Sequence, residues 1–366
     1  MQIVHLIAAA RPNFMKIAPL YHALARAGWC QPRIVHTGQH YDPAMSDAFF
    51  RDLGMPKPDF HLEVGSGTHA EQTGGVMVAY ERVIATERPA WIVVVGDVNS
   101  TAACAMVGAK AWIPVVHLEA GLRSRDRQMP EEINRLVTDA IADVLWTPSS
   151  DADQNLIAEG VPRERIDFVG NIMIDSYEML RERIERSTAI AAHGLEPGGY
   201  AVVTLHRPSN VDIRENLALL VDQLVKVARK LPVIFPVHPR TRKRLAEFSL
   251  SAAFDAEPGV HLTEPLGYID FMGLVSGSRA AITDSGGVQE ETTYLGIPCL
   301  TLRENTERPV TVSEGSNRLV RPEELGVRID EVLGGRWPTG RRPDLWDGRA
   351  AERCVAALAR RSSVRA

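Results

Sequence analysis

Three acidic residues, each placed where a strand or helix pattern meets a loop, are candidates for acid and base chemistry. Glu119 comes directly after a short apolar run, Asp97 follows another run after one glycine, and Glu131 opens a helical pattern after a proline. Taken singly, Asp97 is suited to capping a helix and Glu131 to the positive end of one. Three carboxylates at one site instead favour proton transfer. Because neighbouring helix residues point about 100° apart, we expect only one of Glu131 and Glu132 to face that site.

Basic residues occupy comparable positions along the chain. Arg11 and Lys16 follow the first apolar run, and His206 and His238 each follow a later one. Single cations of this kind are commonly solvated, and single histidines commonly belong to a core or a surface. Several basic residues at the ends of strands, together with Arg308 further along, favour an anionic ligand.

A serine–glycine–glycine turn is the sharpest local signal for that anion. Ser285, Gly286 and Gly287 follow an apolar run and open a helical pattern, so bare backbone N–H groups and the positive end of a helix dipole suit a diphosphate. One turn further on, Glu290 or Glu291 is placed to accept hydrogen bonds from ribose hydroxyls. A glycine-rich turn without a ligand is the alternative, but the basic residues favour a nucleotide diphosphate. The first strand pattern is not followed by G-x-G-x-x-G, which argues against a nicotinamide or flavin dehydrogenase.

These residues are spaced along a pattern of short apolar strands that alternate with helices. We expect strands at residues 3–7, 33–37, 91–95, 114–118, 145–147 and 167–169, and a second series at 200–205, 233–237, 260–262, 280–283 and 298–301. Helical patterns such as residues 68–87 and 101–111 lie between the strands. Apolar strands separated by helices indicate parallel sheets with both faces covered. The sequence therefore predicts an α/β fold with two doubly wound domains, whose ligands bind beyond the carboxyl ends of the strands.

The boundary between the two domains is expected between Gly170 and Tyr200. Residues 176–193 have the pattern of one long charged helix, and the glycine-rich residues 194–199 have that of a linker. We expect the two domains to be residues 1–170 and residues 171–348.

The end of the chain is expected to form a surface loop and a docked helix. Residues 334–348 are rich in Gly, Pro and Arg, which is typical of a surface loop. A last helix over residues 349–361 carries Cys354, Val355 and Leu358 on one apolar stripe, so it should pack against another part of the protein.

The composition is that of a globular protein, and it excludes several classes. Of the 366 residues, 45% are hydrophobic and 24% are charged, which excludes disorder and fibrous repeats. The net charge of −5 argues against general nucleic-acid binding, and no apolar run approaches the ~20 residues of a membrane-spanning helix. The N-terminus lacks the pattern of a signal peptide, and the four scattered cysteines form no metal-binding spacing. We therefore expect a cytoplasmic protein with neither a membrane nor a nucleic-acid partner.

The motifs described above occur in the same order in one enzyme family. The shared segments are residues 11–16, 37–40, 96–97, 117–123, 130–135, 170–171, 206–207, 236–238, 284–291 and 306–309. On these segments the chain resembles the non-hydrolysing UDP-N-acetylglucosamine 2-epimerases up to about Val320. The resemblance implies two Rossmann-like domains that face each other across a cleft, the GT-B type. It also implies that residues 349–366 pack back onto the first domain.

The resemblance further implies roles for individual residues. The implied catalytic residues are Asp97, Glu119, Glu131, His206, Arg11 and Lys16. The implied UDP-sugar-binding residues are Arg135, Phe271, Ser285, Gly286, Gly287, Glu291, Arg308 and His238. In this family the glycine turn binds the diphosphate, the residue matching Glu291 binds the ribose, and the residue matching Phe271 stacks on uracil. Some members have a second UDP-sugar site, which Gln39, Arg207 and His238 match.

The implied reaction is the reversible conversion of UDP-N-acetylglucosamine to UDP-N-acetylmannosamine. No carbonyl acidifies the C2–H bond of this sugar, but departure of UDP from C1 does, and readdition of UDP to the resulting glycal completes the inversion. Removing a proton from one face and delivering one to the other needs at least two acid/base groups. The family resemblance implies no metal or redox cofactor, a homodimer, and a product used in surface polysaccharide synthesis.

Three other functions remain open from the sequence. A hydrolysing 2-epimerase would release UDP and free N-acetylmannosamine. A GT-B glycosyltransferase would share the diphosphate turn but has no use for three carboxylates. A catalytically silent UDP-sugar sensor would bind its ligand without turnover. Related epimerases also act on other 2-acetamido sugars, among them diacetamido uronic acids.

Overall fold

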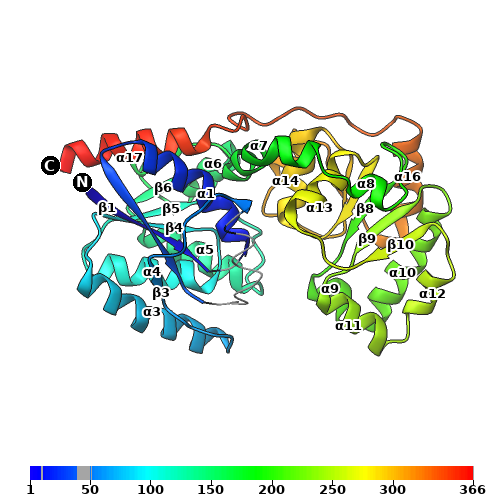
Figure 1. The fold of residues 1–366 in the computed structure, drawn as a ribbon, viewed down its shortest axis with the longest axis horizontal. Coiled ribbons are helices and arrows are strands. Elements are labelled where there is room, and N and C mark those ends of the chain that lie inside the picture. Colours follow the sequence, from blue (N-terminus) through cyan, green and yellow to red (C-terminus); the bar gives the residue numbers. More distant parts are fainter. Residues whose placement is uncertain (10, 39–49, 51, 366) are drawn as a thin grey trace. The chain divides into compact units, whose positions relative to one another are not determined.

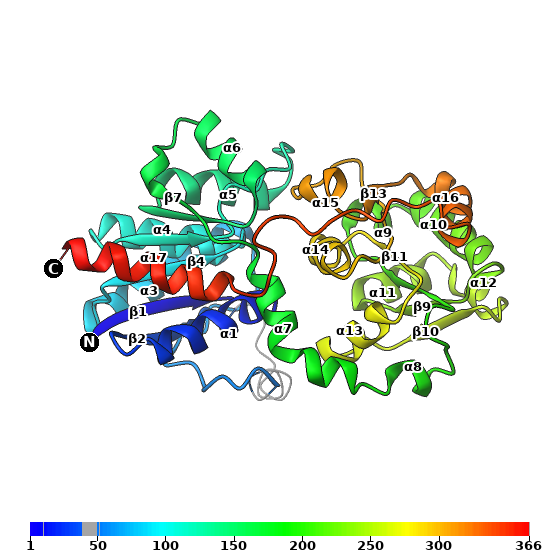
Figure 2. The same cartoon turned by 90° about the horizontal axis from the view of Figure 1, so that it is seen from above.

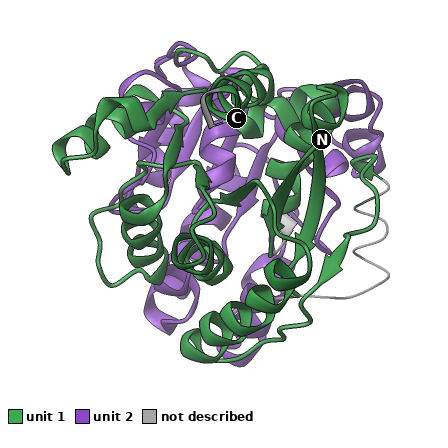
Figure 3. Cartoon of the chain, turned by 90° about the vertical axis from the view of Figure 1, so that its left-hand side faces the viewer, with its two compact units in different colours: residues 1–179, 344–366 green, residues 180–343 purple. Residues whose placement is uncertain are grey.

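The chain forms two compact units, which Figure 3 colours separately. The computed structural model describes residues 1–9, 11–38, 50 and 52–365, without the side chains at positions 11, 12, 364 and 365. Unit 1 consists of Met1–Met179 and Asp344–Ala366, and unit 2 of Leu180–Pro343. The first boundary lies inside one helix, α7 (Ile172–Glu185), so the chain passes between the units without an intervening loop at that point.

Unit 1 is built around a parallel sheet in the order β3-β2-β1-β4-β5-β6-β7. Its strands are β1 (Gln2–Ala8), β2 (Cys30–His36), β3 (Phe60–His61), β4 (Trp91–Val95), β5 (Val115–Leu118), β6 (Val144–Thr147) and β7 (Ile166–Phe168). The six strands predicted for the first half are confirmed. The sequence pattern missed β3, because two residues that pair with Val35 and His36 leave no periodic signal.

Helices cover both faces of this sheet, so its central strand β4 is apolar throughout. The described helices of unit 1 are α1 (Arg11–Arg26), α3 (His69–Thr86), α4 (Asn99–Lys110), α5 (Pro130–Ile141), α6 (Ser150–Ala158), the first part of α7, and α17 (Ala350–Arg365), with a 3-10 turn, η1 (Arg163–Arg165). α1 and α17 lie side by side on one face, and α3 and α4 lie on the other (Figure 1, Figure 2). Strand order reverses between β1 and β4, which is where doubly wound sheets bind their ligands.

Side-chain caps account for the starts of two of these helices, one local in sequence and one distant. Thr68 caps α3: its hydroxyl accepts the N–H of Glu71 at 3.2 Å, and the Glu71 carboxylate accepts the N–H of Thr68 at 2.8 Å. Asp175 caps α17 from a distant part of the chain, because its carboxylate accepts the N–H groups of Ala350 at 3.0 Å and Ala351 at 2.8 Å. These hydrogen bonds satisfy donors that the first turn of any helix leaves free.

Unit 2 has a second parallel sheet, in the order β10-β9-β8-β11-β12-β13. Its strands are β8 (Ala201–Thr204), β9 (Val233–Pro236), β10 (Val260–Thr263), β11 (Ala280–Thr283), β12 (Cys299–Thr301) and β13 (Asn317–Leu319). The five strands predicted for the second half are confirmed. The sequence pattern missed β13, since only one of its three residues is apolar.

The helices of unit 2 are shorter on average, and α10 contributes a large part of the core. They are the end of α7, α8 (Ala189–Ala192), α9 (Pro208–Val211), α10 (Arg214–Ala228), α11 (Pro239–Glu247), α12 (Ser251–Asp255), α13 (Tyr268–Ser276), α14 (Gly286–Leu295), α15 (Val310–Ser313) and α16 (Leu325–Leu333), with a 3-10 turn, η2 (Pro322–Glu324). On α10, Leu217, Leu220 and Leu224 are buried on one stripe against the sheet.

Two predictions about connecting segments were wrong in part. The helix predicted over residues 176–193 is two helices, α7 and α8, because Ser187 turns away from the helical pattern and donates to the carboxylate of Asp270 at 2.7 Å. Residues 334–348 form a loop as predicted, but two tryptophans anchor it. Trp337 and Trp346 are both buried, and their indole N–H groups donate to backbone carbonyls at 2.8 and 2.9 Å.

The predicted docking of the last helix is confirmed. Cys354 and Leu358 on α17 are fully buried, and Val355 is half-buried. Among the helices of the described residues, none is both long and apolar enough to cross a membrane.

Gly170, which ends the turn after β7, provides a test of this packing. Its φ is +91°, and a Cβ atom there would collide with the carbonyl oxygen of Leu345. Gly160 is a matched control, because its φ is +85° and a Cβ there would meet no atom within 4 Å. Both alanine variants should lose the roughly 1–2 kcal/mol that a left-handed backbone costs. We expect Gly170→Ala to lose about 1–3 kcal/mol more in urea unfolding, and equal losses would contradict the packing described.

Candidate active site

Asp97 lies in the turn after β4, where its carboxylate and backbone are both held. Arg135 on α5 binds the carboxylate, with Nη1 2.5 Å from Oδ2, and Asn134 donates to the Asp97 carbonyl at 2.9 Å. Glu132 in turn holds Arg135 at 2.7 Å and accepts backbone N–H groups from the preceding loop, among them that of Ser124 at 2.9 Å. About a third of the Asp97 side chain remains exposed. The aspartate is therefore fixed in place but accessible.

Glu119, directly after β5, is buried and has a strained backbone. Its φ is +71°, which non-glycine residues adopt rarely and which concentrates at functional sites. One carboxylate oxygen, Oε2, forms an ion pair with Lys16 on α1, and the other, Oε1, is buried and has no hydrogen-bond partner among the described residues. A buried carboxylate oxygen without a partner is costly, so it suits a position where a ligand supplies the partner.

The Asp97 turn and Glu119 are neighbours because Gly96 has no side chain. A Cβ atom at Gly96 would lie 3.3 Å from Oε2 of Glu119 and 3.3 Å from Nζ of Lys16. Unit 1 therefore brings together four of the predicted residues, namely Lys16, Asp97, Glu119 and Arg135.

Glu131 and Glu132 point in different directions, as their adjacent positions predict. Glu132 is buried in the network that holds Arg135, whereas Glu131 is exposed on the first turn of α5. The side chain of Arg11 lies outside the description, and so does Gln39. Sequence reasoning missed the role of Glu132, although its spacing of three residues from Arg135 on a helix is a signal for an ion pair.

In unit 2, the predicted diphosphate turn stands at the start of α14. Ser285 is the residue before the helix, and its N–H donates to the Thr283 hydroxyl at 2.9 Å. A Cβ atom at Gly286 would lie 2.6 Å from Nη1 of Arg308, whereas one at Gly287 would meet no atom within 4 Å. Gly286 thus permits the close approach of Arg308, and Gly287 leaves the end of the helix open.

Arg308 belongs to a buried cluster of charges that the sequence did not reveal. Its Nη1 lies 2.6 Å from Glu307 and its Nε 2.8 Å from Glu290, while Arg303 holds Glu307 at 2.7 Å. Arg207 lies 3.7 Å from the same Glu307. Burial alone would raise the pKa of Glu307, but the charges of Arg308 and Arg303 outweigh it and hold the pKa far below its usual value. Glu307 therefore stays ionised and fixes Arg308 beside the glycine turn.

His206 is oriented by an aspartate that lies just before the same turn. The buried Asp284 binds Nδ1 of His206 at 2.9 Å and also accepts the backbone N–H groups of His206 and Arg207. The ring of His238 lies 5.7 Å from that of His206, and its Nδ1 accepts the N–H of Arg240 at 3.2 Å. The predicted histidines are thus brought together at the ends of β8 and β9.

Glu291 lies inside α14, and Tyr268 on α13 donates to it at 2.8 Å. Burial raises the pKa of Glu291 to about 8, the Tyr268 hydrogen bond opposes this shift, and the charge of Glu290 adds to it. Phe271, on the same helix as Tyr268, is half-buried. Glu291 is therefore mostly protonated at neutral pH, and its carboxyl group can both donate and accept hydrogen bonds.

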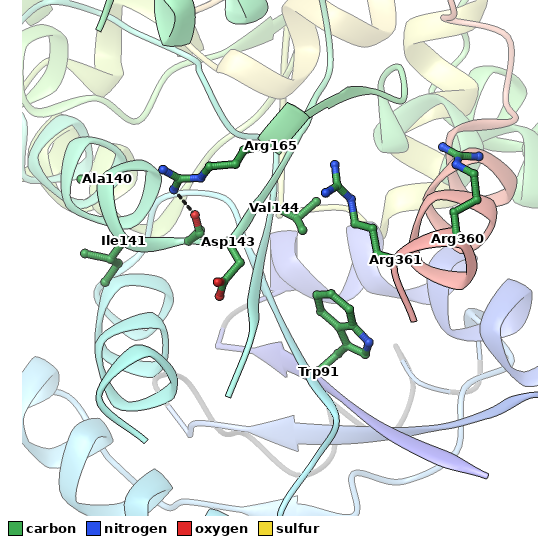
Figure 4. A pocket seen from close by; sticks show the side chains of 9 residues that line it. Trp91, Ala140, Ile141, Asp143, Val144, Arg165, Arg360 and Arg361 are labelled. Carbon is green, nitrogen blue, oxygen red and sulfur yellow. Dashed lines mark hydrogen bonds between the residues drawn. The ribbon is translucent and has the colours of Figure 1, made fainter. Parts of the chain in front are cut away.

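A separate pocket of unit 1 lies away from the carboxylates. It has a volume of about 730 Å³ and is lined by residues at the amino ends of β4 and β6, including Trp91 and Val144, and by arginines (Figure 4). Two of these arginines already have partners: Arg165 donates to the Ala142 carbonyl, and Arg361 binds Asp167 at 3.0 Å.

Among the described residues, no group of three or more His, Cys, Asp or Glu side chains is arranged to hold a metal ion.

The pKa of Glu291 leads to a prediction about stability. A carboxyl group whose pKa is raised on folding stabilises the protein fully below its unfolded pKa, near 4.5, and this contribution is lost as the pH rises through about 8. Glu291→Gln keeps the shape of the side chain without its titration. We expect the stability of the native protein relative to the variant to fall between pH 5 and pH 9, by at most about 1.4 kcal/mol per pH unit. If urea unfolding gave the same difference in unfolding free energy between the native protein and Glu291→Gln at pH 5 and at pH 9, the burial of an ionisable group at this position would be disproved.

Comparisons with known proteins agree with this fold. A family model described as UDP-N-acetylglucosamine 2-epimerase matches residues 22–359. The UDP-N-acetylglucosamine 2-epimerase of Methanocaldococcus jannaschii is 40% identical over 362 residues, which cover 96% of this chain and 98% of that protein. The UDP-2,3-diacetamido-2,3-dideoxy-D-glucuronate 2-epimerase of Pseudomonas aeruginosa is 39% identical over 317 residues, which cover 86% and 87% of the two chains.

A solved structure is similar over the whole chain. The crystal structure of the M. jannaschii UDP-GlcNAc 2-epimerase in complex with UDP-GlcNAc and UDP has a TM-score of 0.90 and 38% sequence identity, and it covers 98% of this chain and 99% of that one. This similarity confirms the predicted fold class, α/β with two Rossmann-like domains of the GT-B type. With a family model that spans nearly its full length, the chain belongs to the UDP-N-acetylglucosamine 2-epimerase family.

Proposed function

We propose that this protein catalyses the reversible 2-epimerisation of UDP-N-acetylglucosamine to UDP-N-acetylmannosamine without net hydrolysis. One observation carries the proposal: the buried Glu119, with one oxygen paired to Lys16 and the other without a partner among the described residues, lies beside the turn of an accessible Asp97. This arrangement suits a reaction in which protons move while positive charge develops on a sugar ring.

The chemistry proceeds by elimination and readdition. A carboxylate removes the C2 proton as the bond between C1 and the UDP oxygen breaks, and UDP leaves with the bonding electrons to give a glycal. A proton then arrives at C2 from the opposite face, and the UDP oxygen attacks C1. We assign Asp97 and Glu131 to the two proton transfers and Glu119 to stabilisation of the charged transition state. Lys16 and Arg135 would hold the carboxylates of Glu119 and Asp97 in place, and Arg11 belongs to the same catalytic set on the family resemblance.

We propose that unit 2 holds the nucleotide of the UDP-sugar. The N–H groups of the Ser285–Gly287 turn and the cations Arg308 and His206 suit the diphosphate, which must stay bound while it is detached from the sugar. Glu291 would bind the ribose, Phe271 would stack on the uracil ring, and His238 would add to the basic surroundings.

The closest alternative is a 2-epimerase that acts on a different sugar nucleotide, or one that hydrolyses the UDP-sugar and releases UDP. The related P. aeruginosa protein is named for a diacetamido glucuronate substrate, which favours a test with more than one sugar nucleotide.

We further propose that the protein works as a homodimer and that its product serves surface polysaccharide synthesis, both of which rest on the family resemblance. The molecular mass of the purified protein, measured by sedimentation, tests whether it is a homodimer.

Turnover in deuterated water tests the reaction and its route together. We expect NMR spectra of UDP-N-acetylglucosamine in D2O to show UDP-N-acetylmannosamine, with deuterium at C2 of both sugars, because the removed proton exchanges with solvent. Retention of protium at C2 in the product would contradict elimination. Net release of UDP and free N-acetylmannosamine would show a hydrolysing enzyme, and a requirement for an acceptor sugar would show a glycosyltransferase. Ligand binding without any turnover would show a sensor.

Asp97→Asn tests the assignment of the acid and base. The amide keeps an acceptor for Arg135 but cannot take up a proton, so we expect kcat to fall by about 10²–10⁴-fold while the affinity for UDP stays within a few-fold of that of the native protein. Asp126→Asn is the control, because among the described residues the Asp126 carboxylate accepts one hydrogen bond, from the backbone N–H of Gln128 at 3.0 Å, within the loop before α5. Near-native turnover by Asp97→Asn would remove Asp97 from the mechanism.

A further inference from the structure

His117, in β5 two residues before Glu119, is completely buried, and oxygen acceptors face both of its ring nitrogens. Nδ1 lies 2.5 Å from the carboxylate of Asp139, and Nε2 lies 2.8 Å from the backbone carbonyl of Gly96. Neither partner has a proton to donate, because one is a backbone carbonyl and the other a carboxylate. A neutral imidazole has only one N–H, so one of these short contacts would then join two lone pairs. Both ring nitrogens are therefore placed to donate a hydrogen bond.

Asp139 supplies the counter-charge for such a ring. Besides His117, its carboxylate accepts the N–H of Gly121 at 3.0 Å and a guanidinium N–H of Arg123 at 2.7 Å. Burial alone would raise the pKa of Asp139, but the charges and hydrogen bonds of His117 and Arg123 outweigh it and lower the pKa below its usual value. Asp139 is therefore ionised although it is 1% exposed.

Arg123 is shared between Asp139 and a second carboxylate. It binds Glu159 through two contacts, at 2.8 and 2.6 Å. Because Glu159 is exposed, water screens its charge, and the buried part of the network consists of Asp139, Arg123 and His117.

This network joins the two loops that carry Asp97 and Glu119. Through Nε2, His117 fixes the carbonyl of Gly96, the residue directly before Asp97. Through the Gly121 N–H, Asp139 fixes the loop that Glu119 begins, where Glu119 and Gly121 have φ values of +71° and +80°. A Cβ atom at Gly121 would lie 2.5 Å from the carbonyl of Ala152, so this loop has a single tightly packed conformation. A chain of hydrogen bonds thus sets the distance between the two carboxylates.

We propose that His117 is a buried imidazolium which, with Asp139 as its counter-ion and Arg123 beside it, positions Asp97 and Glu119 for proton transfer. His117 and Asp139 are positioning residues, because they act through the two loops and not on the substrate. The inference rests on the proposed function in so far as Asp97 and Glu119 carry out the chemistry. The protonation of His117 does not depend on that function.

The substitution Asp139→Asn tests the positioning role. The amide removes the negative charge and cannot accept from His117, Gly121 and Arg123 as the carboxylate does, so His117 should lose one proton and the Gly96 turn should shift. We expect kcat for the epimerisation to fall by about 10–100-fold with KM and UDP affinity nearly unchanged, since displacement of a reacting group by about 1 Å has an effect of that size.

A matched variant at the other end of the same strand separates positioning from stability. Asp143 accepts the N–H of Val115, the first residue of β5, at 2.8 Å, and lies at the amino end of the sheet, away from the carboxylates. Asp143 is exposed, so Asp143→Asn alters a carboxylate that binds the same strand without disturbing a buried ion pair, and it should leave kcat within about two-fold. Equal losses of kcat in the two variants, or native kcat in a folded Asp139→Asn, would overturn the positioning role.

NMR of 15N-histidine-labelled protein reads the protonation state directly. In the native protein we expect two N–H resonances with imidazolium nitrogen shifts from one histidine, identified as His117 by their loss in His117→Gln. In Asp139→Asn one of them should disappear. A single N–H with the shifts of a neutral ring in the native protein would overturn the proposal. If the native protein failed to exchange the C2 proton, the proposed function would fail while the NMR result for His117 stood by itself.

Discussion

The ion pair between Lys16 and Glu119 is the contact on which the organisation of unit 1 depends. A carboxylate buried to this degree is unstable unless a cation and hydrogen-bond donors compensate it. Lys16 comes from the helix after β1 and Glu119 from the end of β5, so the pair forms only if the intervening strand β4 lies between them in the sheet. The turn after β4 must then pass close to both side chains, which a glycine at position 96 permits.

Unit 2 uses the same principle around a different group. Glu307 is buried among three arginines, and it fixes Arg308 against the glycine turn at the start of α14. Asp284 does the same for His206, through one ion pair and several backbone hydrogen bonds. In unit 2, buried acidic residues that do not themselves need to touch a ligand determine where basic groups point. Such fixed charges cost no rearrangement when a charged ligand arrives.

Much of the fold was predictable, because short apolar runs bounded by turns are a strong signal for buried parallel strands. Eleven predicted strands are present, and those that were missed, β3 and β13, are short or polar. The helix predicted over residues 176–193 is interrupted at Ser187. Its hydroxyl donates a hydrogen bond to Asp270, a contact that only the tertiary structure creates. The two tryptophans of the loop at 334–348 are buried for the same kind of reason, since their partners lie elsewhere in the chain.

The sequence by itself determined which residue types stand at the ends of the strands, and hence the family and the chemistry expected of it. Only the tertiary structure decided how those residues are paired. Lys16 and Glu119 are 103 positions apart, and Asp97 and Arg135 are 38 apart, so no local pattern relates them. Likewise, the adjacent Glu131 and Glu132 look equivalent in sequence until Arg135 and the preceding loop bury one of them. The physical reason is that local periodicity sets strands and helices, whereas a buried charge is stabilised by partners that only the folded sheet brings within reach.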